Sequence, residues 1–301
     1  MRRFLAAIAG TLGLMAALTA TEAPDLGYRV DADWPSLPSG THLAEVAAAA
    51  VDDDGNIHIF HRGEEPIMVF SREGKLLRSF GKGLFDSPHG LRIDPEGNLW
   101  AADSGSHIVV KLSPQGRVLM VLGRRGQPDL AKERFDRPTD VAFGANGDVY
   151  ITDGYGNSRV VKYSKDGDYL GEWGKKGVDQ GEFNTPHGII IDKAGRVYVA
   201  DRENFRIQIF DADGKFLEQW KHVGSPFGFA MSDDGFLFMA DGYNDRVLKL
   251  NPDNGKILGA IGRHGRAPGR FDVVHHLAVD SHGSVYAAEI VTLRVQRFTP
   301  R

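Results

Sequence analysis

Residues 141–174 read VAFGANGDVYITDGYGNSRVVKYSKDGDYLGEWG, and this pattern recurs along the chain. An alternating apolar run leads into an Asp/Gly turn, a second run ends in aspartate, and two more alternating runs follow. The alternation has a period of two, as in Arg159–Tyr163, and it therefore predicts strands instead of helices. The stretch predicts one unit of four short strands.

Self-similar units extend in both directions from this stretch, at 91–123, 189–220 and 229–262. By subtraction, their turn glycines lie 42, 50, 48, 40 and 48 residues apart, at Gly55, Gly97, Gly147, Gly195, Gly235 and Gly283. These spacings suit four-stranded blades, whereas solenoid repeats are usually shorter or helical. The sequence therefore predicts an all-β, six-bladed β-propeller over residues 24–301.

The last unit lacks an outer strand, because Ser284–Glu289 and Leu293–Phe298 are followed by the end of the sequence. An unassigned strand-like piece, GYRVDADW, stands at Gly27–Trp34. We predict that this N-terminal piece supplies the missing strand, which would close the ring and remove an exposed sheet edge. The alternative is that the piece is a loose leader.

The composition limits the function classes. The 301 residues carry a formal net charge of −4 and contain no cysteine. Without cysteine there is no disulfide, thiolate zinc site or cysteine nucleophile. No basic block appears, so nucleic acid is not an expected partner.

The first residues have the features of an export signal. Arg2 and Arg3 precede an apolar run from Phe4 to about Ala20, and small residues follow. This pattern predicts a signal peptide over residues 1–23, cleaved after Ala20 or Ala23. We expect a periplasmic or secreted protein with no stable membrane insertion after cleavage, and an uncleaved anchor is the alternative.

Histidine occupies one repeat position in every second unit. Eight residues before the turn glycines stand, in order, Ala47, His89, Thr139, His187, Phe227 and His275. Because the innermost strands of a propeller line its axis, equivalent positions form a ring. Three imidazoles related by a threefold would converge on that axis and leave a fourth position open, as in catalytic zinc sites. Any one of them taken alone suits a turn histidine that bonds the backbone.

A second column follows the next strand. Six residues after the turn glycines stand His61, Asp103, Asp153, Asp201, Asp241 and Glu289, and such acids usually cap turns by accepting hydrogen bonds from backbone amides. The residue after this column is Arg62 in the first unit and Arg202 in the fourth, which face each other across a six-membered ring. Two guanidiniums at a channel mouth suit carboxylate binding, with surface ion pairs as the alternative. Tyr155 either projects towards the same mouth or packs in the core.

The units resemble NHL repeats. More narrowly, GDVYITDGYGNSRVVKYS at 147–164, GEFNTPHGIIID at 181–192 and GRVYVADRENFRIQIFD at 195–211 resemble the lyase half of the peptidylglycine α-amidating enzymes. That resemblance covers nearly all of the chain after residue 23. It implies a six-bladed propeller with zinc on three histidines in its central cavity.

The resemblance assigns roles to individual residues. The zinc ligands of the family match His89 in PHGLRID, His187 in PHGIIID and His275 in FDVVHHLAVD. Its active-site tyrosine matches Tyr155, and its two functional arginines match Arg62, in FHRGEEP, and Arg202, in ADRENFRIQ. Counting repeats had already placed these residues near one mouth.

One implied site departs from the family pattern. The family binds calcium through two backbone carbonyls, which match Ala49 and Leu91, and through an aspartate whose position holds His276 here. Imidazole is a poor ligand for a hard cation that prefers oxygen. The sequence thus argues against calcium while leaving the zinc ligands intact.

The expected function is that of an exported zinc-dependent lyase with a small peptide-like substrate. It would cleave the C–N bond of a peptidyl-α-hydroxyglycine or a similar carbinolamide to an amide and glyoxylate, with zinc as Lewis acid. Tyr155 would be the base, while Arg62 and Arg202 would stabilise its ionised form and hold the substrate carboxylate.

Two other functions remain open. One is a propeller hydrolase such as a lactonase, although such sites usually place acidic and amide ligands around calcium. The other is a non-catalytic secreted propeller that binds peptides, glycans or protein partners, because one fold hosts many functions. Metal content would separate this second alternative from the lyase.

Overall fold

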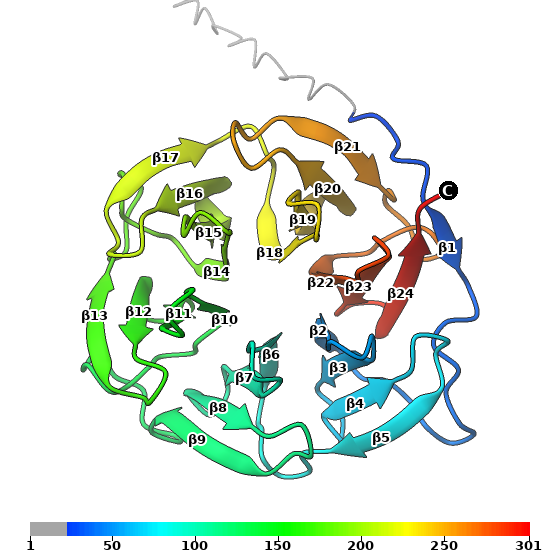
Figure 1. Ribbon diagram of the computed structural model, residues 1–301, viewed down its shortest axis with the longest axis horizontal. Coiled ribbons are helices and arrows are strands. Elements are labelled where there is room, and N and C mark those ends of the chain that lie inside the picture. Colours follow the sequence, from blue (N-terminus) through cyan, green and yellow to red (C-terminus); the bar gives the residue numbers. More distant parts are fainter. Residues whose placement is uncertain (1–22) are drawn as a thin grey trace, which may run out of the picture.

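Six four-stranded antiparallel sheets stand in a ring around a central axis (Figure 1). This computed structural model describes residues 23–301, and the predicted signal peptide lies outside the described residues except for Ala23. Among the described residues, no helix has the length and apolar character needed to cross a membrane. The predicted all-β, six-bladed propeller is confirmed.

Each blade runs outward from the axis in chain order, except that the outermost strand of blade six comes from the N-terminal segment. Blade one contains β2 (Val46–Val51), β3 (Ile57–His61), β4 (Ile67–Phe70) and β5 (Leu76–Phe80). Blade two contains β6 (Pro88–Ile93), β7 (Leu99–Asp103), β8 (Ile108–Leu112) and β9 (Val118–Gly123). Blade three contains β10 (Asp140–Phe143), β11 (Val149–Asp153), β12 (Arg159–Tyr163) and β13 (Tyr169–Trp173).

The second half of the ring repeats this order. Blade four contains β14 (Pro186–Ile191), β15 (Val197–Asp201), β16 (Arg206–Phe210) and β17 (Phe216–Trp220), with the short helix η1 (Arg202–Asn204) after β15. Blade five contains β18 (Pro226–Met231), β19 (Leu237–Asp241), β20 (Arg246–Leu250) and β21 (Ile257–Ile261), with η2 (Gly242–Asn244) after β19. Blade six contains β22 (Val274–Val279), β23 (Val285–Glu289), β24 (Arg294–Thr299) and β1 (Arg29–Asp31).

The N-terminal strand closes the ring as predicted. β1 pairs with β24 through Arg29 with Thr299, Val30 with Phe298 and Asp31 with Arg297. Trp34 follows and is 5% exposed, its ring 5.0 Å from that of Tyr286 in blade six and 6.0 Å from that of Phe70 in blade one. The strand is shorter than the sequence suggested, and the rest of the piece joins two blades by apolar packing.

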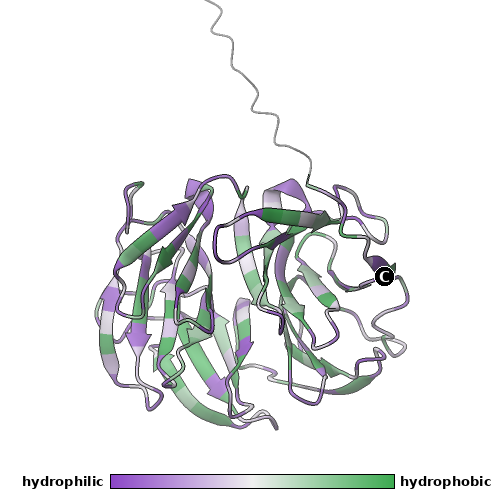
Figure 2. Ribbon diagram, turned by 45° about the horizontal axis from the view of Figure 1, so that its top comes forward, coloured by the Kyte–Doolittle hydropathy of each residue, from purple (hydrophilic) through white to green (hydrophobic). Residues whose placement is uncertain are grey.

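The hydrophobic core lies between blades. Buried Phe60 and Val69 of blade one pack with Leu91 and Val110 of blade two, and equivalent clusters fill the other five gaps. Figure 2 shows apolar segments on the strands and polar residues in the connecting loops. Interblade packing therefore fixes the direction in which each inner strand presents its side chains to the axis.

The acidic column caps loops as predicted. Asp103 accepts hydrogen bonds from the amides of Asp86 and Ser87 at 2.9 Å and 2.6 Å, and Asp201 accepts one from the amide of Asn184 at 2.7 Å. These carboxylates anchor the loops that enter each blade next to the axis, and they hold the residues that follow the column in place.

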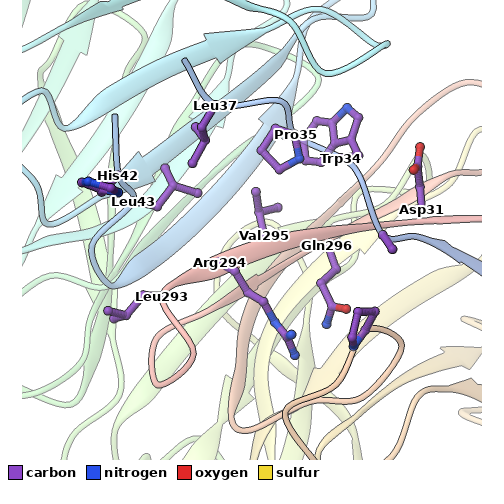
Figure 3. A pocket seen from close by; sticks show the side chains of 12 residues that line it. Asp31, Trp34, Pro35, Leu37, His42, Leu43, Leu293, Arg294, Val295 and Gln296 are labelled. Carbon is purple, nitrogen blue, oxygen red and sulfur yellow. The ribbon is translucent and has the colours of Figure 1, made fainter. Parts of the chain in front are cut away.

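A pocket of about 330 Å³ lies at the rim, beside the ring closure (Figure 3). The N-terminal segment contributes Trp34, Leu37 and Leu43, and blade six contributes Arg294 and Val295. None of the axial histidines lines this pocket.

Candidate metal centre

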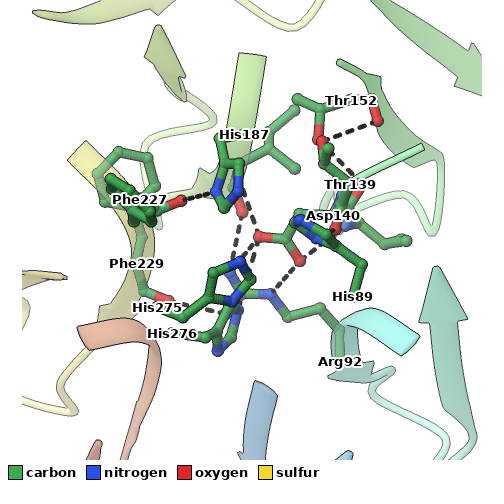
Figure 4. Close-up of polar contacts among 12 residues, drawn as sticks. His89, Arg92, Thr139, Asp140, Thr152, His187, Phe227, Phe229, His275 and His276 are labelled. Carbon is green, nitrogen blue, oxygen red and sulfur yellow. Dashed lines mark hydrogen bonds and ion pairs between the residues drawn. The ribbon is translucent and has the colours of Figure 1, made fainter. Parts of the chain in front are cut away.

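Three histidines converge on the propeller axis. His89, His187 and His275 are 2–3% exposed, and they offer nitrogen atoms that lie within 4.8 Å of one another. Their ring centroids are 4.6, 4.7 and 4.8 Å apart. The near equality of these distances is the threefold arrangement that the repeat count predicted (Figure 4).

The three other members of the same ring orient the imidazoles. The Nδ1 atom of His89 lies 2.7 Å from the Thr139 carbonyl, that of His187 lies 2.8 Å from the Phe227 carbonyl, and that of His275 lies 2.7 Å from the Ala47 carbonyl. Because a carbonyl only accepts, each Nδ1 carries the proton, and each Nε2 keeps its lone pair. Such hydrogen bonds fix the orientation and tautomer of metal-binding histidines.

Burial keeps the imidazoles neutral. It lowers the pKa of His89 to about 3, against the opposing hydrogen bond to the Thr139 carbonyl. Burial and the charge of Arg202 lower the pKa of His187 well below its ordinary value, and burial together with His89 does the same for His275. Three neutral imidazoles with inward lone pairs fit a divalent transition metal ion, for which imidazole is a suitable ligand.

Tyr155 lies directly against this centre. Its hydroxyl oxygen is 3.1 Å from Nε2 of His89 and 3.0 Å from Nε2 of His187. The tyrosine follows Asp153, which ends β11 and caps the loop before the blade. The intervening Gly154 is closely packed, since a Cβ there would lie 2.0 Å from the Pro186 carbonyl oxygen. The predicted projection of Tyr155 towards the axis is therefore present.

The two predicted arginines also reach the centre. Arg202 donates to the Tyr155 hydroxyl oxygen at 3.2 Å, and its guanidinium lies 5.3 Å from the centroid of the tyrosine ring. Arg62 donates from Nε to the carbonyl of Pro88 at 3.3 Å, which places it beside His89. The charge of Arg62 contributes to the low pKa of both His89 and His275.

Other residues complete the mouth and were not predicted. Arg137 donates to the Tyr155 carbonyl at 3.1 Å, with its guanidinium 5.8 Å from the tyrosine ring centroid. Phe227 lies beneath Arg202 at 4.9 Å and beside the ring of Tyr243 at 4.9 Å. Both positions can be counted, since Arg137 stands ten residues before Gly147, and Tyr243 stands eight residues after Gly235, as Tyr155 does after Gly147.

The implied calcium site does not fit these residues. Arg92 reaches the axis below the histidines and donates to both carboxylate oxygens of Asp140, at 3.0 Å and 2.6 Å. It also donates to the carbonyl of Phe229 at 2.9 Å and to that of Ile189 at 3.2 Å (Figure 4). Calcium takes six to eight oxygen ligands, and the oxygens here already bind a guanidinium.

His276 does not replace the missing calcium ligand. It is 4% exposed, and neither ring nitrogen has a hydrogen-bond partner among the described residues. Nε2 lies 3.7 Å from Asp140 Oδ2, beyond hydrogen-bond distance. Burial and the charge of Arg92 lower its pKa, so this ring is neutral beside the Arg92–Asp140 pair.

Comparisons with known proteins identify relatives of this chain. The NHL repeat family matches residues 85–112, 135–163 and 183–210. Peptidyl-glycine alpha-amidating monooxygenase A of Xenopus laevis is 34% identical over 92% of this chain, and the match covers 34% of that protein. The chain thus spans about a third of the length of this relative.

Two other relatives are matched over more of their length. Peptidyl-alpha-hydroxyglycine alpha-amidating lyase 1 of Drosophila melanogaster is 29% identical over 89% of this chain and 59% of its own. NHL repeat-containing protein 3 of Homo sapiens is 34% identical over 91% of this chain and 84% of its own.

A solved structure shares the fold at low identity. A gluconolactonase from Xanthomonas campestris superposes with a TM-score of 0.68 at 16% identity, covering 95% of this chain and 93% of the other. This likeness shows the fold alone. The matched repeats, the six blades and the human relative together establish that the chain belongs to the NHL-repeat family of β-propeller proteins, with homologues among the peptidyl-α-hydroxyglycine α-amidating lyases.

Proposed function

We propose that the protein is a zinc-dependent lyase that cleaves the C–N bond of a peptidyl-α-hydroxyglycine, or a similar carbinolamide, to an amide and glyoxylate. One observation carries the proposal: the Tyr155 hydroxyl lies within 3.2 Å of two converging imidazoles and of the Arg202 guanidinium. A base, a cation and a metal-binding centre therefore meet at one point. The lyase name of the Drosophila melanogaster relative supports the same reaction class.

The reaction needs a proton taken from the carbinol hydroxyl. When that proton leaves, the oxygen forms the carbonyl of glyoxylate, the C–N bond breaks, and its electron pair goes to the amide nitrogen, which takes up a proton. Tyr155 is the base in this scheme, because its oxygen lies at the centre. A zinc ion held by His89, His187 and His275 would supply Lewis acidity to the substrate oxygen.

Two cations prepare the tyrosine and the substrate. Arg202 donates to the Tyr155 oxygen and so holds that oxygen beside the two imidazoles. Arg62 uses Nε to bind the Pro88 carbonyl, which leaves the rest of its guanidinium for the carboxylate of the hydroxyglycine. Phe227 forms an apolar wall between His187 and Arg202 and limits the access of water.

The test measures metal and turnover in one preparation. The protein is expressed without a histidine tag, its zinc is quantified, and α-hydroxyhippurate is supplied as substrate. We expect one zinc per chain and conversion to benzamide and glyoxylate. The control is His187→Ala, in which loss of one ligand lowers both metal content and turnover. A preparation with stoichiometric zinc that leaves α-hydroxyhippurate unchanged at high enzyme concentration would refute the proposal.

Export is part of the proposal. The signal-like sequence of residues 1–23 and the absence of cysteine support a periplasmic or secreted location. Cell fractionation followed by N-terminal sequencing tests it. The expected product begins after Ala20 or Ala23, and protein with residues 1–23 intact in the cytoplasm would contradict it.

A second candidate is a non-catalytic binding propeller. It is favoured by the human relative, whose name states repeats and no activity. A binding scaffold has no need of the axial metal, so His187→Ala would leave its binding intact. Zinc-dependent turnover in the assay above would exclude this candidate as the sole function.

A further inference from the structure

We infer that the guanidinium of Arg92 takes the place of a second, oxygen-bound metal ion on the propeller axis. The protein then binds one metal ion at the three histidines and is independent of calcium. This inference rests on the axial residues below the histidines and does not depend on the lyase activity.

The first observation is the span of the Arg92 hydrogen bonds. From β6 in blade two, the guanidinium reaches Asp140 in blade three, the carbonyl of Ile189 in blade four and the carbonyl of Phe229 in blade five. Asp140 also accepts a hydrogen bond from the Ile189 amide at 3.2 Å. One side chain thus ties four of the six blades together at the axis, as a metal ion with ligands from several blades would.

The second observation concerns the level of these contacts along the axis. Ile189 and Phe229 stand six residues before their turn glycines, which is also the repeat position of Ala49 and Leu91. The carbonyls that accept from Arg92 therefore belong to the same ring of carbonyls that the family resemblance assigned to calcium. A divalent ion placed there would lie beside a guanidinium and be repelled by it.

The third observation is that the acidic residue at this level stands in blade three, whereas the family resemblance implies an aspartate in blade six. Seven residues before the turn glycines stand Ala48, Gly90, Asp140, Gly188, Gly228 and His276. The position in blade six holds an imidazole, and the carboxylate stands in blade three, on the opposite side of the ring. The glycines make room, since a Cβ on Gly90 would lie 2.9 Å from Asp140 Oδ1, and one on Gly228 would lie 3.0 Å from His276 Cδ2.

Arg92 also divides the axial channel. A pocket of about 220 Å³ lies beyond it, lined by Val51, Ile93, Met231 and Val279. Each of these stands four residues before its turn glycine, so it lies about 13 Å further along the inner strand than the histidine position. Arg92 itself lines this pocket, and its hydrogen bonds to the Ile189 and Phe229 carbonyls lie between the pocket and the histidine position along the inner strands.

The first arm of the test uses the unaltered protein. After chelation and reconstitution with zinc, its metal content is measured, and thermal unfolding is followed with calcium chloride or with a calcium-selective chelator. We expect zinc without calcium, and the same Tm in both solutions. One equivalent of bound calcium, or a Tm that rises with calcium, would overturn the inference.

The second arm removes the guanidinium. Arg92→Met leaves the Asp140 carboxylate buried and unpaired, which lowers Tm by roughly 6–20 °C. Calcium should restore part of this loss, because the vacated site keeps a carboxylate and a ring of carbonyls. The matched control is Arg246→Met. The Arg246 guanidinium pairs with Asp241 at a distance of 2.8 Å, and this pair does not lie on the axis. This variant should lose stability without any response to calcium.

An Arg92→Met variant whose Tm and calcium response equal those of the unaltered protein would overturn the inference. If this variant does not fold, the metal content and calcium response of the unaltered protein still decide the question.

Discussion

The Tyr155 hydroxyl is the group on which the proposed chemistry depends most directly. Tyr155→Phe removes an oxygen that lies 3.1 Å and 3.0 Å from two imidazole nitrogens and 3.2 Å from Arg202. The aromatic ring stays, with centroids 5.3 Å from His89 and 5.7 Å from His187, so the packing around the metal centre is kept. A positioned general base contributes about 10²–10⁴ in rate, which at about 1.4 kcal/mol per tenfold change corresponds to about 3–5 kcal/mol.

The assay follows glyoxylate release from α-hydroxyhippurate and reports kcat, KM and zinc content together. We expect kcat to fall by about 10²–10⁴ while KM and zinc change little, because the hydroxyl acts on the proton and not on the carboxylate. Tyr243→Phe is the matched control, since its hydroxyl contacts Glu203 at 3.3 Å and no histidine. A Tyr155→Phe enzyme that keeps kcat within a few fold of the unaltered protein would refute the assignment, and loss of zinc would show a role in holding the metal.

Two further predictions concern stability. In the metal-free protein, the pKa of His89 is about 3 when folded and 6.5 when unfolded, so only the unfolded state gains protons as pH falls below 6.5. The free energy of unfolding is therefore kept above pH 6.5 and falls below it, by up to about 4 kcal/mol per pH unit for three such histidines. Urea unfolding at pH 7.5, 6.5 and 5.5 measures this free energy. A value that does not change with pH would contradict the burial of neutral imidazoles. Gly154→Ala should destabilise the fold by about 1–3 kcal/mol and lower kcat, because its Cβ would lie 2.0 Å from the Pro186 carbonyl oxygen. Gly171→Ala has no neighbouring atom within 4 Å and should be close to neutral in the same unfolding and turnover measurements.

The fold and the convergence of three histidines could be predicted from the sequence, because repetition gives each residue a defined place in the ring. His89, His187 and His275 share one place in the unit, and the unit fixes where that place lies in space. The same counting predicts that the acid column caps loops, as Asp201 does. Counting could also have identified Arg92 and Asp140. Arg92 stands three residues after the histidine position of its unit, and Asp140 stands one residue after that position in its own unit.

Counting repeat positions does not by itself reveal the other parts of the site. The carbonyls of Thr139, Phe227 and Ala47 orient the imidazoles, but every residue type carries a carbonyl, so the ring position alone does not reveal them. Arg137 stands two residues before Thr139 and Tyr243 stands at the repeat position of Tyr155, but neither position holds the same residue type throughout the ring. Their contacts depend on loop conformation, which only the folded backbone determines.

The ring explains how a sixfold architecture produces a threefold cluster of histidines. A ring with histidine at all six positions would place twice as many imidazoles on the axis. Every residue that offers its carbonyl as an acceptor would then also carry an imidazole of its own. Alternation divides the work: each histidine presents Nε2 to the axis and donates Nδ1–H to the carbonyl of the next ring member. Substitution of Thr139 or Ala47 by other small residues should therefore be tolerated, because the backbone atom is kept, whereas a large side chain would push the acceptor carbonyl out of line. In the proposed reaction, the groups that act on the substrate are those that break this symmetry, namely Tyr155 from blade three and Arg202 from blade four, which donates to the Tyr155 hydroxyl.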